Sequence, residues 1–446
     1  MSQRTYLANA AGEKQKATVV VANTWATNDL ATLEIDNVSF TLTVGSLVTT
    51  AQVATSLQEM LDAGADEALT DTTALYAPTT GPQNAGQFKE LTSSVASSTV
   101  TVLGPTGVPF TISGSESTAG SGTITVTSAL RAATGKWHFD NQDNWSGNTV
   151  PVDNDEIVFE SGESGPLYAL TPAIQPAKVT KLMAFTGQIG LPNINKSNQG
   201  LPYSEYRTKA LTFDDNSVTC TYELEVGEGR GSSLCRIAAG AGQSIFNVYG
   251  KPQRTDNAVP PTLLTGTHAS NVLNNFGGDV GFGFYPDETG TLATLNHGNG
   301  PQTSAVTYCG VGVTLTSATI SVNGGTLTTN SALSTSAGGV TIHAGKHYHY
   351  AGNVGDLTIE KGGEFILRAG TNITFAGTVK LMGGKLNLGD YQRVATFSNA
   401  VELYKDYEFN DPNGTANTNT DFTPVGCTLD DGKLRLGPDR TLRKTA

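Results

Sequence analysis

The chain has 446 residues, of which 51 are glycine and only 15% are charged, and its formal net charge is −13. Such an acidic balance argues against nucleic acid as a partner and favours solubility at high local concentration. Thr, Ser, Val and Asn are common while helical periodicity is nearly absent. The composition is therefore typical of an extended β protein, not of a compact enzyme.

Targeting signals are missing from the sequence. Residues 1–16 contain no apolar core long enough for a signal peptide, and no run approaches the ~18 apolar residues of a membrane span. We therefore expect a protein that is made in a cytoplasm and has no membrane partner.

Residues 1–17 are polar and show no periodicity. This pattern predicts an extended N-terminal arm that gains order by lying on a neighbouring subunit, or a frayed terminus. Arg4, Lys14 and Lys16 are the basic side chains with which such an arm would contact its neighbour.

Residues 18–135 predict a small α+β module in which one helix covers a sheet. The helix is expected over residues 50–61, with Thr49 or Thr50 as its cap. Its apolar positions fall on one face: Val53, Leu57, Met60 and Leu61. The expected strands are at 17–22, 30–36, 38–44, 88–92, 98–103, 109–113 and 122–127.

The remainder, residues 136–446, predicts a β-helix domain that starts with a capping segment at 137–159. In this segment Trp137 and Trp145 are expected to cover the open end of a stack of repeats. Pro151 and Asp155 are expected to turn the chain into the first strand.

A strand, a Gly-Gly step and a second strand recur in the domain, at 320–327, 357–367 and 379–388, with a looser copy at 431–436. The second glycines, Gly325, Gly363 and Gly384, are 38 and 21 positions apart, which indicates coils of roughly 20 residues. Apolar and polar residues alternate along each strand, and glycine permits the corner between strands. The pattern predicts a right-handed parallel β-helix, with irregular insertions in 214–318; a β-sandwich with glycine turns is the alternative.

Few residues suggest chemistry, so we expect no enzymatic activity and no cofactor. Acidic clusters at 153–156, 214–215 and 411–414 are typical of turns in which Asp and Asn bind their own backbone. His347 and His349 would point to the same side of a strand. Copies of this pair around a three-fold axis would offer six imidazoles to a transition metal; an exposed strand that packs on a neighbour is the alternative.

Three parts of the sequence resemble uncharacterised structural proteins of phage virions, and the first of them also resembles some secreted β-helix passengers. The first is the segment Trp137–Phe159, with its Asn-Trp-Ser, Pro and Asp, although here Gly147 follows the serine directly. The second is the preceding module, with its Asp-Leu-Ala-Thr-Leu-Glu-Ile-Asp-Asn hairpin. Phe185–Pro192, which follows the cap, shares the likeness. The similarity spans about residues 18–213 and implies a virion component.

Within the virion role that the resemblance implies, we expect a capsid decoration or cement protein, bound outside the lattice of the major capsid protein on the virion surface. We expect a homotrimer, because repeat solenoids have flat lateral β-faces that associate, usually with closed symmetry. The alternative is a tail fibre or spike that binds a host-surface glycan. Its aromatic contacts would be Tyr203, Tyr206, Tyr222, Tyr348 and Tyr350. A bacterial surface adhesin is the third reading.

Overall fold

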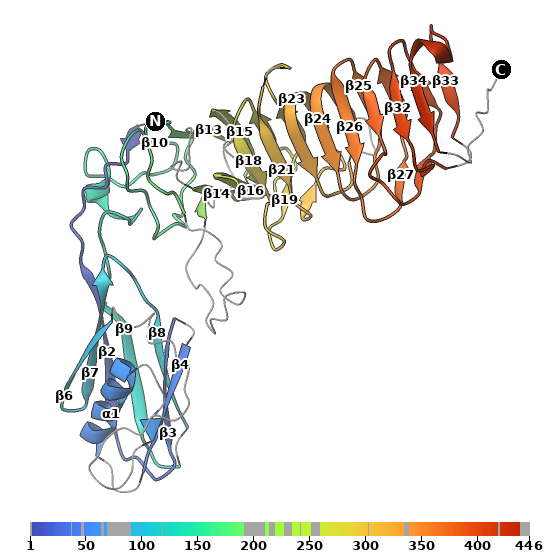
Figure 1. Ribbon diagram of the computed structural model, residues 1–446. Helices are drawn as coiled ribbons and strands as arrows, with labels where there is room; N and C mark the ends of the chain where they lie inside the picture. Colours follow the sequence, from blue (N-terminus) through green and yellow to red (C-terminus); the bar gives the residue numbers. More distant parts are fainter. Residues whose placement is uncertain are drawn as a thin grey trace.

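The chain folds into a small N-terminal module and a long β-solenoid that meet at one end of the solenoid (Figure 1). The first described residues lie at this junction and the last described residues at the far end. The computed structural model describes residues 2–36, 38–45, 49–63, 67–68, 91–117, 119–190, 210–213, 219–226, 234–240, 242–250, 259–301, 303–333, 339–417 and 420–437.

The N-terminal module consists of two four-stranded sheets and one helix, α1 (Thr50–Ala63). One sheet is antiparallel and contains, in order, β6 (Thr92–Ala96), β7 (Thr99–Thr106), β2 (Lys14–Ala22) and β9 (Thr123–Arg131). The other contains, in order, β5 (Glu67–Ala68), β4 (Val38–Thr43), β3 (Leu30–Ile35) and β8 (Ile112–Ser117). The apolar sides of these elements form a core of their own, separate from that of the solenoid.

Helix α1 begins with a reciprocal pair of hydrogen bonds. The Gln52 amide donates to Thr49 Oγ1 over 3.3 Å, and the Thr49 amide donates to Gln52 Oε1 over 2.8 Å. This arrangement is a capping box, which satisfies two otherwise unpaired donors of the first turn. The predicted helix and its cap at Thr49 are therefore confirmed. Val53, Leu57 and Met60 are buried in the core of the module.

The solenoid has about 11 turns and is a parallel β-helix. Its first face starts with β1 (Gln3–Thr5), β10 (Glu156–Phe159), β11 (Lys178–Lys181), β13 (Cys220–Val226), β15 (Ser244–Gly250), β17 (Val272–Asn275) and β20 (Thr294–His297). It continues with β23 (Thr319–Thr329), β24 (Val340–His349), β25 (Leu357–Glu360), β28 (Val379–Met382), β31 (Val401–Leu403) and β33 (Phe422–Pro424).

The second face starts with β12 (Leu211–Phe213), β14 (Cys235–Ala239), β16 (Thr262–Gly266), β18 (Asp279–Phe282) and β21 (Val306–Cys309). It continues with the second halves of β23 and β24, then β26 (Gly363–Leu367), β29 (Lys385–Asn387), β32 (Glu408–Asp411) and β34 (Lys433–Leu436). A third, less regular face contains β19 (Gly290–Thr291), β22 (Val313–Thr314), β27 (Ile373–Phe375) and β30 (Ala395–Phe397). Among the described residues, the 3-10 helices η1 (Gln142–Asn144) and η3 (Leu429–Asp431) lie near the two ends of the solenoid.

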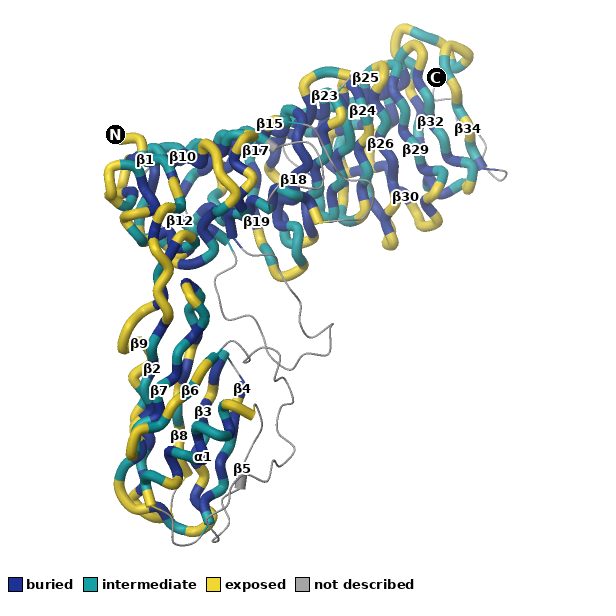
Figure 2. Tube along the Cα trace, turned by 60° about the vertical axis from the view of Figure 1, so that its left-hand side comes forward, coloured by how far each residue is buried: buried dark blue, intermediate teal, exposed yellow. Residues whose placement is uncertain are grey.

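Equivalent side chains stand above one another in successive coils. Leu357, Val379 and Val401 are register partners on the first face, each 22 positions after the last. All three point into the continuous solenoid core, and Figure 2 shows buried residues recurring along every turn of the rod. On the third face Phe375 stacks on Phe397, with ring centroids 4.5 Å apart. Each coil therefore buries its inward side only because the next coil covers it.

Glycine forms the corner between the first and second faces. Gly345 and Gly383 have φ of 84° and 82°, in the left-handed region that side chains disfavour. A Cβ added to Gly345 would lie 2.6 Å from the Gly325 carbonyl oxygen of the preceding coil. Gly345 pairs with Gly363, so one full coil lies between the Gly325 and Gly363 copies. The spacing of 38 positions thus corresponds to two coils.

The domain boundaries differ from the sequence-based expectation. Strand β2 of the module begins at Lys14, while β1 pairs with β10 and belongs to the solenoid. The module is therefore an insertion into the first coil of the solenoid, not a domain that precedes it. The described part of region 214–318, expected to hold irregular insertions, contains strands from β13 to β22 that stay in register with their neighbouring coils. Residues 214–218, 227–233, 241, 251–258 and 302 of this region lie outside the described residues.

A substitution at Phe365 can test the packing between coils, because its side chain is fully buried in the solenoid core. Its ring lies 5.0 Å from His347 and 6.1 Å from Phe375, centroid to centroid. We predict that Phe365→Ala lowers the free energy of unfolding by about 3–5 kcal/mol, because it leaves a cavity in the core. Met382→Ala, at a side chain that is 42% exposed, is the control and should change stability little. Equal denaturation midpoints for the two variants would contradict the packing.

Candidate functional site

Four aromatic side chains close the N-terminal end of the solenoid; we call them the aromatic plug: Tyr6, Phe139, Trp145 and Phe159. The Trp145 ring lies 4.9 Å from Tyr6 and 4.9 Å from Phe139, both edge to face. The Trp145 indole Nε1 donates to the Phe139 carbonyl over 2.7 Å, and the Tyr6 hydroxyl donates to the Lys136 carbonyl over 2.5 Å. All four rings are buried, so they cover the apolar interior that would otherwise face water.

The other predicted cap residues lie near the plug but not in it. Trp137 is half-buried, with Lys136 Nζ 5.1 Å from its ring centroid, and it lies against Gly107 of the module. Its carbonyl accepts from the amides of Leu167 and Tyr168. Trp137 therefore contributes to the junction with the module, whereas Trp145 contributes to the core.

Pro151 is buried, and Asp155 fixes the entry into β10. The Asp155 carboxylate accepts from the Ser2 amide at 3.0 Å, from the Val152 amide at 3.2 Å and from Arg4 Nε at 3.3 Å. Burial alone would raise the pKa of Asp155, but these three donors together hold it below its ordinary value. The sequence offered no sign that the partner of Asp155 would come from the N-terminus.

The expectation of an extended N-terminal arm is wrong for the described part of residues 1–17. Arg4 lies in β1 and is paired with Asp155, and Tyr6 is buried in the plug. Lys14 and Lys16 lie in β2, where Lys14 is exposed and Lys16 half-buried. The physical reason is that a solenoid end needs an apolar cover, and Tyr6 supplies it from within the same chain.

His347 and His349 do share one side of β24, but that side is the interior of the solenoid. Both are fully buried, so neither can meet symmetry-related copies at a three-fold axis. The proposed metal site is therefore wrong in its geometry, as is the exposed strand that was its alternative. Gly345 of β24 aligns with Gly363 of β26, which places His347 opposite Phe365 and His349 opposite Leu367. That alignment of glycines was the signal in the sequence that would have predicted the inward orientation.

Hydrogen bonds hold the two imidazoles as single neutral tautomers. His349 Nε2 donates to the Gly352 carbonyl over 2.7 Å, which leaves its Nδ1 to accept from the Thr329 hydroxyl at 3.0 Å. The Thr329 oxygen in turn accepts from His347 Nε2 at 2.9 Å. His347 Nδ1 is buried and has no hydrogen-bond partner. No group of three or more His, Cys, Asp or Glu side chains among the described residues could hold a metal ion.

A third buried histidine, His297, lies two coils earlier, on β20. His297 Nδ1 is 2.9 Å from the Thr307 hydroxyl, which also accepts from Asn275 Nδ2 at 2.9 Å. Burial lowers the pKa of His297 to about 3 and that of His349 to about 4. The pKa of His347 is also lowered well below its ordinary value, by burial and by the two other histidines. These three histidines make the stability of the core depend on pH, and because they are buried none of them can contact a ligand at the surface.

The tyrosines expected to bind a glycan, and the acidic clusters, do not come together in one site. Tyr222 is buried and stacks on Phe246 at 4.8 Å, while Tyr348 and Tyr350 point outward on β24 and just after it. Tyr203 and Tyr206, and the acidic pair at 214–215, lie outside the described residues. Asp411 is buried and accepts from the amides of Thr415 and Ala416, as expected of a turn.

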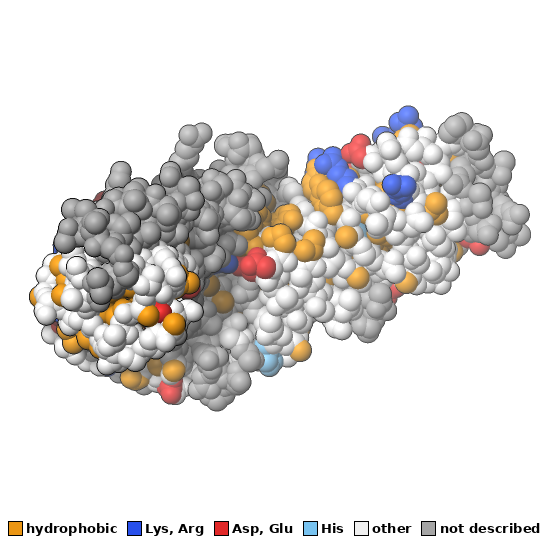
Figure 3. Space-filling model, turned by 90° about the horizontal axis from the view of Figure 1, so that it is seen from below, with side chains coloured by type: hydrophobic (Ala, Val, Ile, Leu, Met, Phe, Trp, Pro, Cys, Tyr) orange, Lys and Arg blue, Asp and Glu red, His pale blue; other side chains and the backbone are white. Residues whose placement is uncertain are grey.

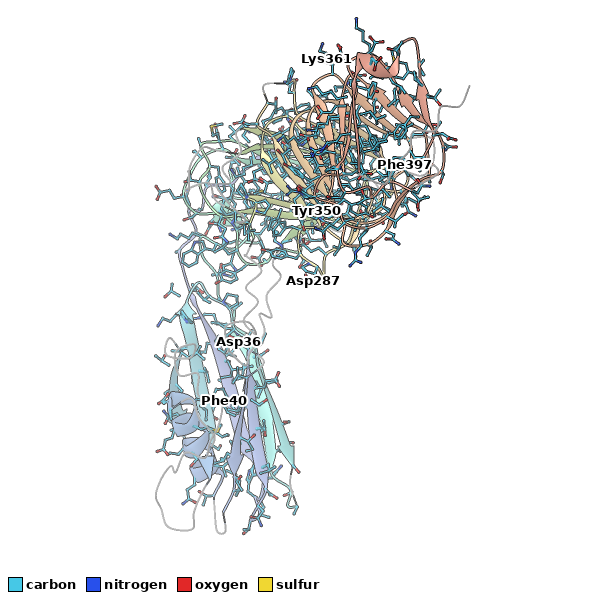
Figure 4. All side chains as sticks on the ribbon, turned by 45° about the vertical axis from the view of Figure 1, so that its right-hand side comes forward. Asp36, Phe40, Asp287, Tyr350, Lys361 and Phe397 are labelled. Atoms are coloured by element: carbon cyan, nitrogen blue, oxygen red, sulfur yellow. The ribbon has the colours of Figure 1, made fainter. Side chains whose placement is uncertain are left out.

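The sequence-based reasoning missed a hollow on the outer surface of the solenoid, which we call the corner groove. It has a volume of about 700 Å³ and is lined by Asn274, Phe276, Asn296, Gly298, Asn299, Gly300, Pro301, Asn323, His343, Ala344, Gly345, Lys361 and Gly362. Lys361 projects from the upper edge of the rod in Figure 4. The hollow forms at the corner between the first and second faces, where glycines leave space that side chains would fill.

The buried histidines predict a loss of stability in acid. Their folded-state pKa values are depressed, so below about pH 6.5 the unfolded chain binds protons that the folded chain excludes. Stability is fully present above that pH and falls as pH decreases toward 4, by up to about 1.4 kcal/mol per pH unit for each histidine. Denaturant midpoints measured between pH 7.5 and 4.5 should show this slope, and His297→Leu should reduce it. His343→Gln, at an exposed histidine, is the control; a flat profile would contradict the assignment.

If the aromatic plug seals the core, substitutions at two adjacent residues, Tyr6 and Leu7, should change stability to different extents. Tyr6→Ala should lower the free energy of unfolding by about 3 kcal/mol or more, because it opens the end of the core. Leu7→Ala should have little effect, because Leu7 is 46% exposed. Thermal unfolding of both variants checks this, and an unaffected Tyr6→Ala protein would mean that the plug does not seal the core.

No helix among the described residues is long and apolar enough to span a membrane. Comparisons with protein-family models, with curated proteins and with solved structures found no match. The function is therefore inferred from the geometry of the solenoid, the aromatic plug and the corner groove, together with the likeness seen in the sequence.

Proposed function

We propose that the protein is a structural component of a phage virion, and first among such roles a capsid decoration or cement protein on the outside of the major capsid lattice. The observation that carries this proposal is the continuous core of the solenoid, which runs from the aromatic plug to Phe422 near the last coil. Such a rod resists bending because every coil is bonded to the next. A stiff, hydrophilic body of this kind suits a mechanical role.

The junction supports the same role, because it ties the module to the rod at several points. The Glu13 amide donates to the Thr134 carbonyl over 2.8 Å, and the Gly107 amide donates to the Glu13 carbonyl over 2.9 Å. His138 Nε2 donates to the Gly107 carbonyl over 3.0 Å. Load applied to the module would thus pass into the first coil. We assign the contact with the major capsid protein to the module, since Arg4 is engaged with Asp155.

The outer faces of the rod suit close packing between copies, and we propose a homotrimer. On the second face Lys346, Glu364, Lys385 and Glu408 follow one another in successive coils, with N–O distances of 3.9, 3.4 and 3.2 Å. Opposite charges at outward-facing, partly exposed positions contribute little to stability but keep a flat β-surface soluble. Closed rotational symmetry is the usual way in which such surfaces associate.

Copy number tests the decoration role. Quantitative gel densitometry of purified virions should show this chain at a number comparable to that of the major capsid protein, because a cement protein occupies many equivalent lattice sites. The major capsid protein in the same lane is the internal standard. A count of only a few trimers in each particle would reject decoration.

That second outcome would favour the other candidate, a tail fibre or spike that binds a host-surface glycan. The observation in its favour is the corner groove, a polar hollow on the side of a projecting rod. Fibres and spikes are present in few copies, so the same densitometry distinguishes the two roles.

A further inference from the structure

The corner groove runs along the axis of the rod and crosses five successive coils. Asn274, Asn296 and Asn323 come from β17, β20 and β23, His343 comes from β24, and Lys361 follows β25. Neighbouring strands are about 4.8 Å apart, so the groove extends for about 19 Å. An extended chain laid parallel to the axis would meet an equivalent position in every coil.

The floor of the groove is a row of side-chain amides. Asn296 Nδ2 donates to Asn274 Oδ1 over 2.8 Å, and Asn274 Nδ2 donates to Asn247 Oδ1 over 2.8 Å. Asn247 Nδ2 donates in turn to Glu223 Oε1 over 2.8 Å. Each amide has two N–H donors and two acceptor lone pairs, so the ladder leaves further donors and acceptors on every rung. Asn274 and Asn296, which line the groove, are half-buried, so their orientation is fixed while part of each side chain stays accessible.

One end of the groove is aromatic. Phe276 lines it and stacks on Tyr249, with ring centroids 5.2 Å apart and planes inclined by 23°. Tyr249 is 38% exposed, which is unusual for an aromatic side chain of this rod, where most are buried in the core. A pair of parallel rings at the surface offers a flat apolar platform beside the amide row.

The charges of the groove are matched within the protein. Lys361 Nζ is 3.3 Å from Asp406 Oδ2, and His343 Nδ1 is 2.9 Å from Glu360 Oε2. Neither side chain therefore requires a charged ligand. The net charge of −13 also repels acidic polymers. On the face of the rod that Figure 3 shows from below, most of the described surface is white, the colour of uncharged polar side chains and backbone.

We propose that the corner groove binds a neutral polysaccharide, with the sugar chain lying along the axis of the rod. The hydroxyl groups of such a chain both donate and accept, as the amides of Asn274 and Asn296 do. The apolar face of a sugar ring matches the platform of Phe276 and Tyr249. The groove stays open at Gly300 and Gly362, because a Cβ at Gly300 would meet nothing within 4 Å and one at Gly362 would meet only the His343 carbonyl oxygen, at 3.9 Å.

Titration calorimetry on the full chain tests the proposal, with neutral oligosaccharides of the gluco-, manno- and N-acetylglucosamine series as probes. Polygalacturonate and heparin are the acidic probes. We expect at least one neutral series to bind and the acidic polymers not to bind. Phe276→Ala and Asn296→Ala should each weaken the binding about tenfold or more, because each removes a direct contact.

The matched control is Asn410→Ala. Asn410 belongs to a similar ladder on the second face, in which its Nδ2 donates to Asn387 Oδ1 over 2.9 Å, but it does not line the groove. It should leave affinity unchanged, and thermal unfolding would verify that all three variants are folded. Failure of every neutral probe to bind, tighter binding of an acidic polymer, or equal weakening by Asn410→Ala would each overturn the proposal. None of these results depends on the virion role, which copy number tests separately.

Discussion

The parallel backbone ladder between successive coils is the interaction on which the rest of the structure depends. Each strand takes its hydrogen bonds from the coils on both sides, and each coil buries its inward side chains only against them. The register of Leu357, Val379 and Val401 follows from this constraint. So do the glycine corners, since a Cβ at Gly345 would meet the backbone of the coil before it. The corner groove lies on the outside of these corners.

The first and last coils of a solenoid each have a side that no further coil covers. At the first coil, the N-terminal segment of the same chain covers it. Strand β1 pairs with β10 although the whole module lies between them in the sequence. Tyr6 then fills the space above Trp145, and Arg4 meets the carboxylate of Asp155. The junction is thus formed by two segments of the chain, the one that enters the module and the one that leaves it. At the other end, Leu434 and Leu436 pack only partly against the core.

Short sequence patterns correctly predicted the features that depend on neighbouring residues in the chain. The cap at Thr49 and the inward position of Phe365 follow from a capping box and from alternation about Gly363. Tyr6 could not be predicted, because its short polar segment has no period and its partner strand is remote in the sequence. The buried histidines were misread because alternation was not combined with the register of Gly345 and Gly363, which places His347 opposite Phe365 and His349 opposite Leu367. The corner groove arises from several coils together, and no single segment encodes it.

Native-state amide hydrogen exchange at Tyr6 tests most directly that the N-terminal segment is an integral strand of the solenoid. The Tyr6 amide donates to the Val158 carbonyl over 2.9 Å, and the Val354 amide donates to the Thr374 carbonyl over 2.9 Å in the middle of the rod. If residues 3–6 open only when the first coils open, the Tyr6 amide should be protected to an extent comparable with that of Val354. Exchange of the Tyr6 amide at the rate of an exposed chain, while Val354 stays protected, would contradict the account.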